Sequence, residues 1–315
     1  MGEAMKYASL LDLIGDTPLV DISVLSPNPR VEIWAKLEGQ NPTGSVKDRI
    51  AKYMIEEAER TGRLHPGQTI LEPTSGNTGI SLAMIGRLRG YPVKVVMPDA
   101  VSAERVQLLE AFGAEIIYSA GELGTNGSVQ KAQELAAQHP DWFMPFQYGN
   151  EQNPRAHYET TAPEIIRDLP GVSAFVAGLG TGGTLTGVGR RLKEHNPAVR
   201  VIAAAPHPGD LVQGLRALEE GYIPPVFDDT VLDGRIVVDS ATSFAMAKEL
   251  TQRTGIFAGV SAGAVVRAAQ RTAERMSSGQ IACLLADGGW KYLSSGLWSR
   301  DYADIREQVA EKMWW

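Results

Sequence analysis

The sequence predicts an α/β fold in which helices cover mostly parallel sheets, and three observations support this prediction. The chain has 315 residues, which is enough for two domains of ordinary size. Hydrophobic residues make up 43% of it and charged residues 21%, which is typical of a globular protein with a substantial core. Short β-branched runs alternate with amphipathic helical patterns, and such alternation produces parallel strands joined by right-handed helical crossovers.

Each expected element rests on a local pattern. Short runs rich in β-branched residues predict strands at residues 31–37, 69–72, 93–97, 115–118, 174–177, 200–204 and 280–286. Amphipathic stretches predict helices at residues 45–63, 79–89, 103–112, 128–138, 184–195, 243–254 and 263–276. In the first helix the buried stripe consists of Val46, Ile50, Met54 and Ile55. Pro, Gly and Asn cluster around residues 145–155, where we place a domain boundary.

Composition excludes several classes of function. The formal charge of -7 argues against a general nucleic-acid binder, which needs a basic face. The one cysteine, Cys283, cannot form an internal disulfide, which suits a reducing compartment. The first residues lack the apolar core of a signal peptide, and no apolar run approaches the roughly 20 residues of a membrane span. We therefore expect a cytoplasmic protein with no nucleic-acid partner, no membrane association and no bound metal.

A first turn of small polar residues follows the expected strand at 69–72. In EPTSGNTGI, residues 72–80, Thr74, Ser75 and Thr78 supply hydroxyl donors, and Asn77 can both donate and accept. Backbone N–H groups at the start of the next helix suit a carboxylate. A helix cap would need a single Ser or Asn. The five consecutive small polar residues therefore favour a site for a carboxylate ligand.

A second turn, GLGTGGT at residues 178–184, follows the expected strand at 174–177. It satisfies the G-x-G-x-x-G pattern of a Rossmann dinucleotide site. That site also needs an acidic residue at the end of the next strand, and no acid occurs there before Asp210. The turn instead predicts a phosphate cradle of glycine amides and threonine hydroxyls at a helix start. Its residues are Gly180, Thr181, Gly182, Gly183 and Thr184.

Lys47 lies in NPTGSVKDR, residues 41–49, in the first turn of an expected helix. A solvated charge is the ordinary role of a lysine. However, the positive potential of a helix N-terminus disfavours cations, so a neutral amine is easier to maintain there. A lysine, a phosphate cradle and a carboxylate turn together fit pyridoxal 5′-phosphate (PLP), whose aldehyde reacts with a lysine and whose substrates are amino acids.

The motifs NPTGSVKDR, PTSGNTGI, GTGGT, GVSAGA and IGDTPLV resemble those of the cysteine synthase family, the O-acetylserine and O-phosphoserine sulfhydrylases. The resemblance runs from about Leu10 to about Leu297. It implies PLP fold type II, similar to the tryptophan synthase β subunit, with two open three-layer α/β/α domains. The smaller domain would span residues 39–145 and carry the substrate loop. The larger, residues 1–38 with 146–315, would carry the phosphate cradle.

The resemblance implies a role for each matching residue. Lys47 would form the Schiff base with PLP and later take the substrate's α-proton. Asn77 would contact the 3′-hydroxyl of the cofactor. Ser261, in GVSAGA, would face the pyridine nitrogen and also cap the helix that follows. The substrate carboxylate would be bound by Thr74, Ser75, Asn77, Thr78 and Gln147, and the cofactor phosphate by Gly180, Thr181, Gly182, Gly183 and Thr184.

The implied reaction is a β-replacement. A serine hydroxyl cannot stabilise a positive charge on the pyridine ring, which suits β-elimination. An activated serine would lose its β-substituent to give an aminoacrylate, and a sulfur nucleophile such as sulfide would add to yield L-cysteine.

Arg216, in QGLRALEEG, occupies a position where B-type (M-type) members of the family carry arginine and A-type members carry glycine. A guanidinium near the β-substituent would bind a phosphate through two donors, which favours O-phosphoserine over O-acetylserine. The alternative is a solvated helix arginine beside Glu219 and Glu220. DGGWKYLSSG and the terminal Trp314-Trp315 also resemble the B-type, including the mycobacterial branch. Members of that branch take sulfur from a thiocarboxylated carrier protein.

For a cysteine synthase the resemblance implies a homodimer. Three alternative functions are open. A cystathionine β-synthase, with homocysteine as acceptor, would share nearly all of these motifs. A threonine dehydratase fits less well, because the TSGNT form of the first turn resembles the sulfhydrylases. A non-catalytic family member that docks serine acetyltransferase belongs to a different class. Lys47 argues against inactivity, and Arg216 argues against the A-type, whose members are the ones that dock.

Overall fold

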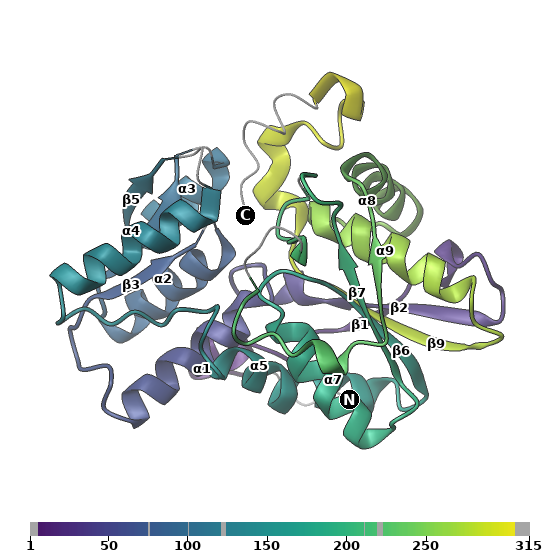
Figure 1. The fold of residues 1–315 in the computed structure, drawn as a ribbon, viewed down its shortest axis with the longest axis horizontal. Coiled ribbons are helices and arrows are strands. Elements are labelled where there is room, and N and C mark those ends of the chain that lie inside the picture. Colours follow the sequence, from purple (N-terminus) through teal and green to yellow (C-terminus); the bar gives the residue numbers. More distant parts are fainter. Residues whose placement is uncertain are drawn as a thin grey trace.

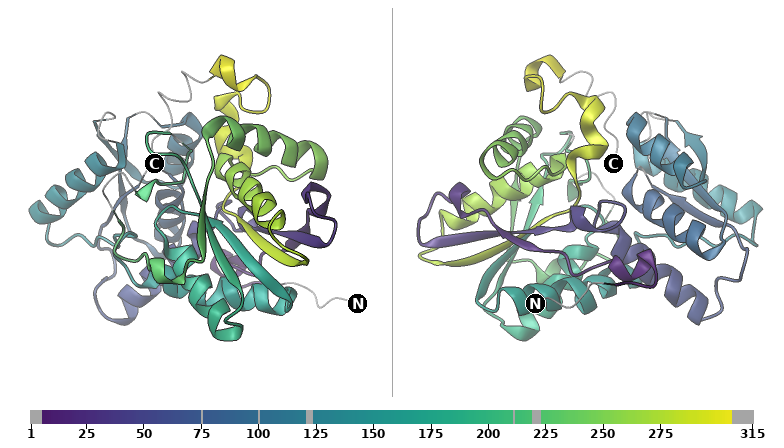
Figure 2. Two further views of the ribbon diagram at one scale, coloured as in Figure 1. Left: turned by 45° about the vertical axis from the view of Figure 1, so that its right-hand side comes forward. Right: turned by 180° about the vertical axis from the view of Figure 1, so that it is seen from behind.

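The computed structural model describes residues 6–74, 76–99, 101–120, 124–210, 212–218 and 223–305. Their strands form two sheets, one of six strands and one of three. In Figure 1 the three-stranded sheet and its helices form the smaller lobe at the left, and the six-stranded sheet lies in the larger lobe at the right. The two lobes are also distinct from behind (Figure 2). No helix within these ranges has the length and apolar character that a membrane crossing requires.

The larger sheet has the strand order β1-β2-β9-β6-β7-β8. Only β1 runs antiparallel to its neighbour among these pairs. The strands are β1 Leu19–Asp21, β2 Val31–Leu37, β6 Val172–Gly178, β7 Arg200–Ala205, β8 Gly234–Val237 and β9 Gly279–Leu285.

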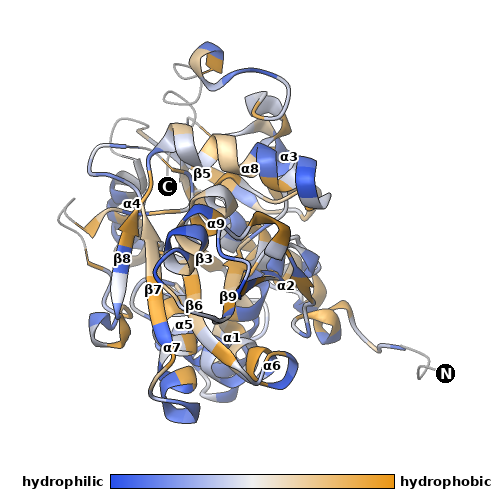
Figure 3. Cartoon of the chain, turned by 90° about the vertical axis from the view of Figure 1, so that its right-hand side faces the viewer, coloured by the Kyte–Doolittle hydropathy of each residue, from blue (hydrophilic) through white to orange (hydrophobic). Residues whose placement is uncertain are grey.

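Helices cover both faces of this sheet. On one face α8 (Ser240–Thr254) packs on α9 (Val260–Ala273), which lies on β6, β7 and β9. On the other face lie α6 (Ala162–Asp168) and α7 (Gly183–His195), with α5 (Gln152–Ala156) packed on α7. In Figure 3 the central strands are coloured mostly as hydrophobic, whereas the helices contain both hydrophobic and hydrophilic residues. Strands that are near-continuous apolar runs, buried on both faces, are typical of parallel sheets covered by helices on both sides.

The smaller sheet is parallel, in the order β3-β4-β5, with β3 at Ile70–Pro73, β4 at Val93–Pro98 and β5 at Glu115–Ser119. One face is covered by α2 (Asn77–Arg89) and α3 (Ala103–Ala111), and the other by α4 (Gly124–Gln138). Each lobe therefore has three layers, as the sequence predicted.

Helix α1 (Lys47–Arg60) joins the two lobes. It packs on α2 of the smaller lobe and on α5 of the larger lobe. Ala51 and Ile55 belong to the core of the smaller lobe, whereas Ile50 and Met54 contact Ala156 of α5. The first turn of α1 is thus placed where the two lobes meet.

Short or proline-containing elements were not predicted. β1 and β8 are edge strands of three and four residues. α5, the π-helical turn His157–Thr161 and α6 begin within the expected boundary at residues 145–155 or follow it, where the sequence predicts no helix. Pro154 and Pro163 stand in the first turns of α5 and α6, where a missing N–H is tolerated. Five helices begin two or more residues away from the expected position: α1 at Lys47, α2 at Asn77, α4 at Gly124, α8 at Ser240 and α9 at Val260.

Short 3₁₀ helices also occur among the described residues: η1 Leu10–Leu13, η2 Ser23–Leu25, η3 Glu38–Gln40, η7 Asp229–Val231 and η8 Gly289–Ser295. The predicted domain limits, residues 39–145 against 1–38 with 146–315, stay a prediction. The strands of the two sheets fall on either side of those limits.

Candidate active site

Two adjoining cavities lie between the lobes at the carboxyl ends of β3, β6 and β9. Both are lined by Lys47, Asn77, Gly180 and Tyr292. Parallel α/β sheets bind ligands at the carboxyl ends of their strands. One cavity is lined by residues predicted to bind the substrate and the other by residues predicted to bind the cofactor. Lys47 lines both cavities and therefore lies between these two groups of residues.

The first cavity contains the described residues predicted for the substrate. It is lined by Thr74, Asn77, Thr78, Gln147 and Arg216. The second contains most of those predicted for the cofactor: Lys47, Asn77, Gly180, Thr181, Gly182, Thr184 and Ser261. Gly183 lies next to them in the chain but does not line the cavity. The predicted site residue Ser75 lies outside the described residues, as do Trp314 and Trp315.

Lys47 is the first residue of α1. The residue before it is anchored next to the end of β9, because the Val46 N–H donates to the Ala286 carbonyl at 2.8 Å. Burial lowers the pKa of Lys47 to about 8, although the charge of nearby Asp287 opposes that shift. A substantial fraction of the amine is therefore neutral near physiological pH, as a nucleophile or a base must be. The sequence predicted this effect from the helix start, and burial is its main cause.

Asp48 fixes the turn that carries Lys47. Its carboxylate accepts hydrogen bonds from the Thr43 backbone N–H at 2.7 Å and from the Ser81 hydroxyl at 2.5 Å, and also from the Thr43 hydroxyl. Ser81 belongs to α2, so this contact ties the start of α1 to the smaller lobe.

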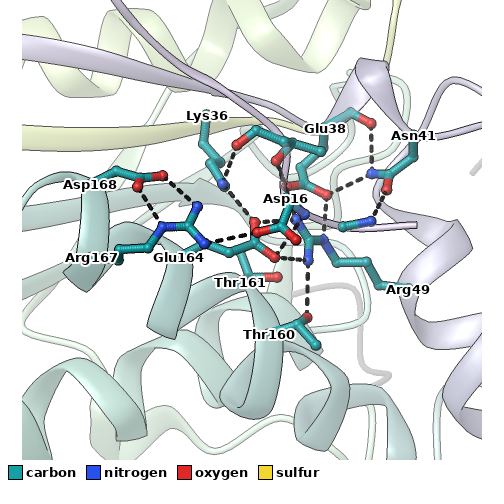
Figure 4. A network of polar contacts seen from close by, with 12 residues as sticks. Asp16, Lys36, Glu38, Asn41, Arg49, Thr160, Thr161, Glu164, Arg167 and Asp168 are labelled. Atoms are coloured by element: carbon teal, nitrogen blue, oxygen red, sulfur yellow. Dashed lines mark hydrogen bonds and ion pairs between the residues drawn. The ribbon is translucent and has the colours of Figure 1, made fainter. Parts of the chain in front are cut away.

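Arg49 ties the same turn to the larger lobe (Figure 4). Its guanidinium bonds the Glu38 carboxylate at 2.7 and 2.9 Å and the Glu164 carboxylate at 2.6 and 2.7 Å. Lys36 forms a further ion pair with Glu164 at 2.7 Å. Burial alone would raise the pKa of Glu38, but the charge and hydrogen bonds of Arg49, with Thr17 and Lys36, hold it at about 2.

The glycine-rich turn between β6 and α7 is closely packed. Gly182 has φ +83°, a conformation that favours glycine, and a Cβ there would lie 2.5 Å from the Phe227 side chain. A Cβ on Gly183 would lie 2.0 Å from Asn153 Oδ1, and one on Gly180 would lie 2.8 Å from the Gly214 carbonyl oxygen. Only glycines let the backbone pass here, which leaves its N–H groups at the start of α7 available to an anion.

Two residues that the sequence analysis missed hold the threonines of this turn. Asn153 Nδ2 donates to Thr181 Oγ1 at 3.1 Å. His157 Nε2 lies 3.1 Å from Thr184 Oγ1. Burial, with the nearby charge of Arg49, lowers the pKa of His157 to about 3, so its ring is neutral. Both residues belong to the unpredicted stretch of α5 and the π-helical turn.

The predicted carboxylate loop is held by Gln147 and Glu72. Thr78 Oγ1 donates to Gln147 Oε1 at 2.7 Å. The backbone N–H groups of Phe146 and Gln147 donate to the Glu72 carboxylate at 2.7 and 2.9 Å. Burial raises the pKa of Glu72 to about 8, although these two N–H donors lower it. Gln147 thus reaches the loop by a hydrogen bond across 69 residues of sequence.

A polar cluster around Asn77 was not predicted either. Asn77 Nδ2 donates to Asp287 Oδ2 at 2.8 Å, and Lys291 Nζ donates to Asn77 Oδ1 at 2.6 Å. The Tyr292 hydroxyl donates to Asp287 Oδ2 at 2.5 Å, and the buried Asp287 Oδ1 has no protein partner among the described residues. Asp287 follows the carboxyl end of β9, and this position after a buried strand is the signal that could have identified the cluster.

Ser261 is the second residue of α9 and lines the cavity. The prediction that it caps this helix is wrong, because α9 begins at Val260 and Gly259 precedes it as the cap. The hydroxyl of Ser261 is therefore not required by the helix terminus.

Arg216 is buried, with 7% of its surface exposed, and lies in a segment without helical structure. Its guanidinium carbon lies 5.8 Å from the centre of the Tyr148 ring, and its backbone N–H donates to the Leu179 carbonyl at 2.7 Å. The solvated helix arginine is therefore the wrong interpretation. Arg105 of α3, which the sequence analysis missed, also lines the first cavity.

Comparison with known proteins identifies the family. The family model described as "Pyridoxal-phosphate dependent enzyme" matches residues 10–287. The chain belongs to this family of pyridoxal-phosphate dependent enzymes. It is 45% identical over 304 residues to a "Probable cysteine synthase" of Bacillus subtilis (strain 168), and the match covers 93% of this chain and 98% of that protein. The resemblance to cysteine synthases and to PLP fold type II is thereby confirmed.

Solved structures of family members have the same fold. An O-ureido-L-serine synthase, 39% identical, matches with a TM-score of 0.89 over 97% of this chain and 100% of that chain. An O-acetylserine dependent cystathionine β-synthase from Helicobacter pylori, 36% identical, also gives 0.89, over 94% of this chain and 100% of that chain. Family members of this fold thus differ in the reaction that their titles name.

The residues of the two cavities fit PLP. A buried amine of lowered pKa, Lys47, stands beside glycines whose space a Cβ would fill. Asp287, whose buried Oδ1 has no partner among the described residues, lines the second cavity. No group of three or more acidic, His or Cys side chains that could hold a metal ion occurs in the part of the chain that the structure describes.

Proposed function

We propose that the protein makes L-cysteine by PLP-dependent β-replacement on an activated serine, with O-phosphoserine preferred to O-acetylserine. The observation that carries the proposal is the position of Lys47 between the two cavities, with the predicted carboxylate loop on one side and the glycine-rich turn on the other. PLP, when bound, withdraws electrons from the substrate's α-carbon so that a β-substituent can leave.

Different residues would bind the cofactor, transfer the proton and orient the substrate. The backbone N–H groups of the turn from Gly180 to Thr184 would bind the cofactor phosphate. Lys47 would hold the cofactor through Nζ and move the substrate's α-proton with the same atom. Thr74, Thr78 and Gln147 would orient the substrate carboxylate. Ser261 offers a neutral hydroxyl to the ring nitrogen, where a carboxylate would hold a positive charge.

The preference for O-phosphoserine rests on Arg216. The chain as a whole carries a charge of -7 and repels anions, so an anionic donor needs a local cation. Arg216 is buried at the first cavity, where the carboxylate loop also lies. A guanidinium offers several donors in a fixed plane and binds phosphate more specifically than an ammonium does.

The sulfur source and the assembly belong to the same proposal. Sulfide, or a thiocarboxylated carrier protein, would supply the sulfur, and the protein would act as a homodimer in the cytoplasm. A cystathionine β-synthase-like reaction with homocysteine is the second candidate, because the similar protein from Helicobacter pylori is a cystathionine β-synthase. Homocysteine is therefore an acceptor to be compared with sulfide.

Replacing Arg216 by alanine should lower kcat/KM for O-phosphoserine by about 2–4 kcal/mol, or roughly 30- to 1,000-fold, because one charge-assisted donor to the leaving phosphate is lost. O-Acetylserine, which has no phosphate to release, should lose far less. Arg216→Lys should restore part of the difference, since lysine brings charge without the planar fork. The measurement is kcat/KM for both donors with sulfide.

Arg191→Ala is a matched control, because Arg191 is exposed on α7 and its contacts, with Glu194 at 3.4 Å and with Tyr158, lie outside both cavities. It should leave the ratio of the two donors unchanged. Equal losses for both donors in Arg216→Ala would remove the donor preference from the proposal.

A further inference from the structure

Lys291 is a buried cation that the reaction outlined above does not use. It lies in η8, with 4% of its surface exposed, and its Nζ donates to Asn77 Oδ1 at 2.6 Å. The two residues are 214 positions apart in sequence. Burying an ammonium is costly unless the ammonium is paired. The energetic cost of burying Lys291 therefore suggests that its contact with Asn77 has a function.

The contact fixes the orientation of the Asn77 amide. A lysine ammonium can only donate hydrogen bonds and an ionised carboxylate can only accept them. With Lys291 on Oδ1 and Asp287 on Nδ2, the amide has one orientation that satisfies both neighbours. A flipped amide would place its NH₂ against the ammonium. Asn77 therefore presents N–H donors, and not its carbonyl oxygen, on the side of Asp287.

Three charged residues from other parts of the chain influence the protonation of Lys291. Asp287, after β9, and Asp48, in α1, favour its protonated form, whereas Arg105, in α3, disfavours it. Burial is the largest influence and lowers the pKa of Lys291 to about 8. At neutral pH the side chain is mostly protonated, and its charge lies one hydrogen bond away from Asn77 Oδ1.

We propose that Lys291 is a positioning residue of the cofactor site, which holds Asn77 so that its N–H faces the 3′-oxygen of the pyridoxal ring and favours the ionised form of that oxygen. The proposal rests on the role proposed for Asn77. It adds a second lysine to the site, which acts on the cofactor through another side chain and not by bonding to it.

The test compares Lys291→Met, Lys291→Arg and Asn77→Ala in the PLP-loaded enzyme. Lys291→Met should weaken PLP binding about 10- to 100-fold, the range for losing a hydrogen bond to a charged group. It should also move the absorption of the bound cofactor to shorter wavelength, because its 3′-oxygen is protonated more readily. Lys291→Arg, which keeps the charge and the donor, should restore both properties at least in part.

Controls separate this role from a structural one. Ser294→Ala changes the same turn at an exposed side chain that bonds Glu104, and it should leave the spectrum and the PLP dissociation constant unchanged. Because Lys291 acts through Asn77, the double variant Lys291→Met/Asn77→Ala should differ little from Asn77→Ala alone.

A wild-type spectrum and PLP affinity in Lys291→Met, with both altered in Asn77→Ala, would overturn the role of Lys291. No change in Asn77→Ala would instead overturn the role of Asn77 on which the proposal rests. A change in Lys291→Met that simply adds to that of Asn77→Ala would also contradict it.

Discussion

Replacing Lys47 by alanine should lower the rate of cysteine formation by at least about 1,000-fold. The side chain would both hold the cofactor and move the α-proton, and proton transfer alone contributes roughly 10²- to 10⁴-fold. The rate is measured with PLP, an activated serine and sulfide. Lys52→Ala, five residues along α1 with its Nζ on the Leu11 carbonyl, is the matched control and should keep the wild-type rate.

The lysine that binds the cofactor covalently can be identified directly. Borohydride reduction of the wild-type holoenzyme, followed by peptide mass spectrometry, should place the cofactor mass on Lys47. Lys291 should stay unmodified although its Nζ bonds Asn77. A Lys47→Ala variant that keeps a covalently bound cofactor and the wild-type rate would show that another amine carries the reaction.

Replacing Arg49 by methionine should destabilise the fold by about 3–5 kcal/mol, the cost of removing one partner from a buried ion-pair network. The Glu38 and Glu164 carboxylates would be left with Lys36 as the remaining cation of the four ion-paired side chains. The free energy of unfolding in urea measures this loss.

Arg60→Met is the control for Arg49→Met. Arg60 lies on the same helix, its side chain is 68% exposed, and it pairs with Glu57 at 2.7 Å. Exposed pairs contribute less than about 1 kcal/mol. A similar small loss for Arg49→Met would mean that the network does not anchor α1 and the turn that carries Lys47.

The residues that the sequence identified belong to local motifs. Lys47 and the turn from Gly180 to Thr184 each lie where an element begins, and that position is the signal the sequence carries, although burial is the main cause of the lowered pKa of Lys47. Most predicted strands lie within two residues of the observed ones, because buried parallel strands are near-continuous apolar runs. β1 and β8 are too short for such a signal.

The residues that the sequence missed depend on long-range contacts. Asn77 meets Asp287 across 210 positions, and Arg49 meets Glu164 across 115. No local pattern encodes such a pair. The burial of Arg216 was missed for the same reason, since the ring of Tyr148 and the backbone of Leu179 that surround it come from other parts of the chain. Ser261 was misjudged as a cap because the start of α9 lies three residues before the predicted one.

The most direct test of the proposed reaction is product formation by the PLP-loaded wild-type protein. Purified holoenzyme is incubated with O-phosphoserine or O-acetylserine, each with sulfide or homocysteine, and the amino-acid products are quantified. The account predicts L-cysteine with sulfide, and a higher kcat/KM with O-phosphoserine. Absence of cysteine from both donors while PLP is bound, or cystathionine formed faster than cysteine, would contradict it.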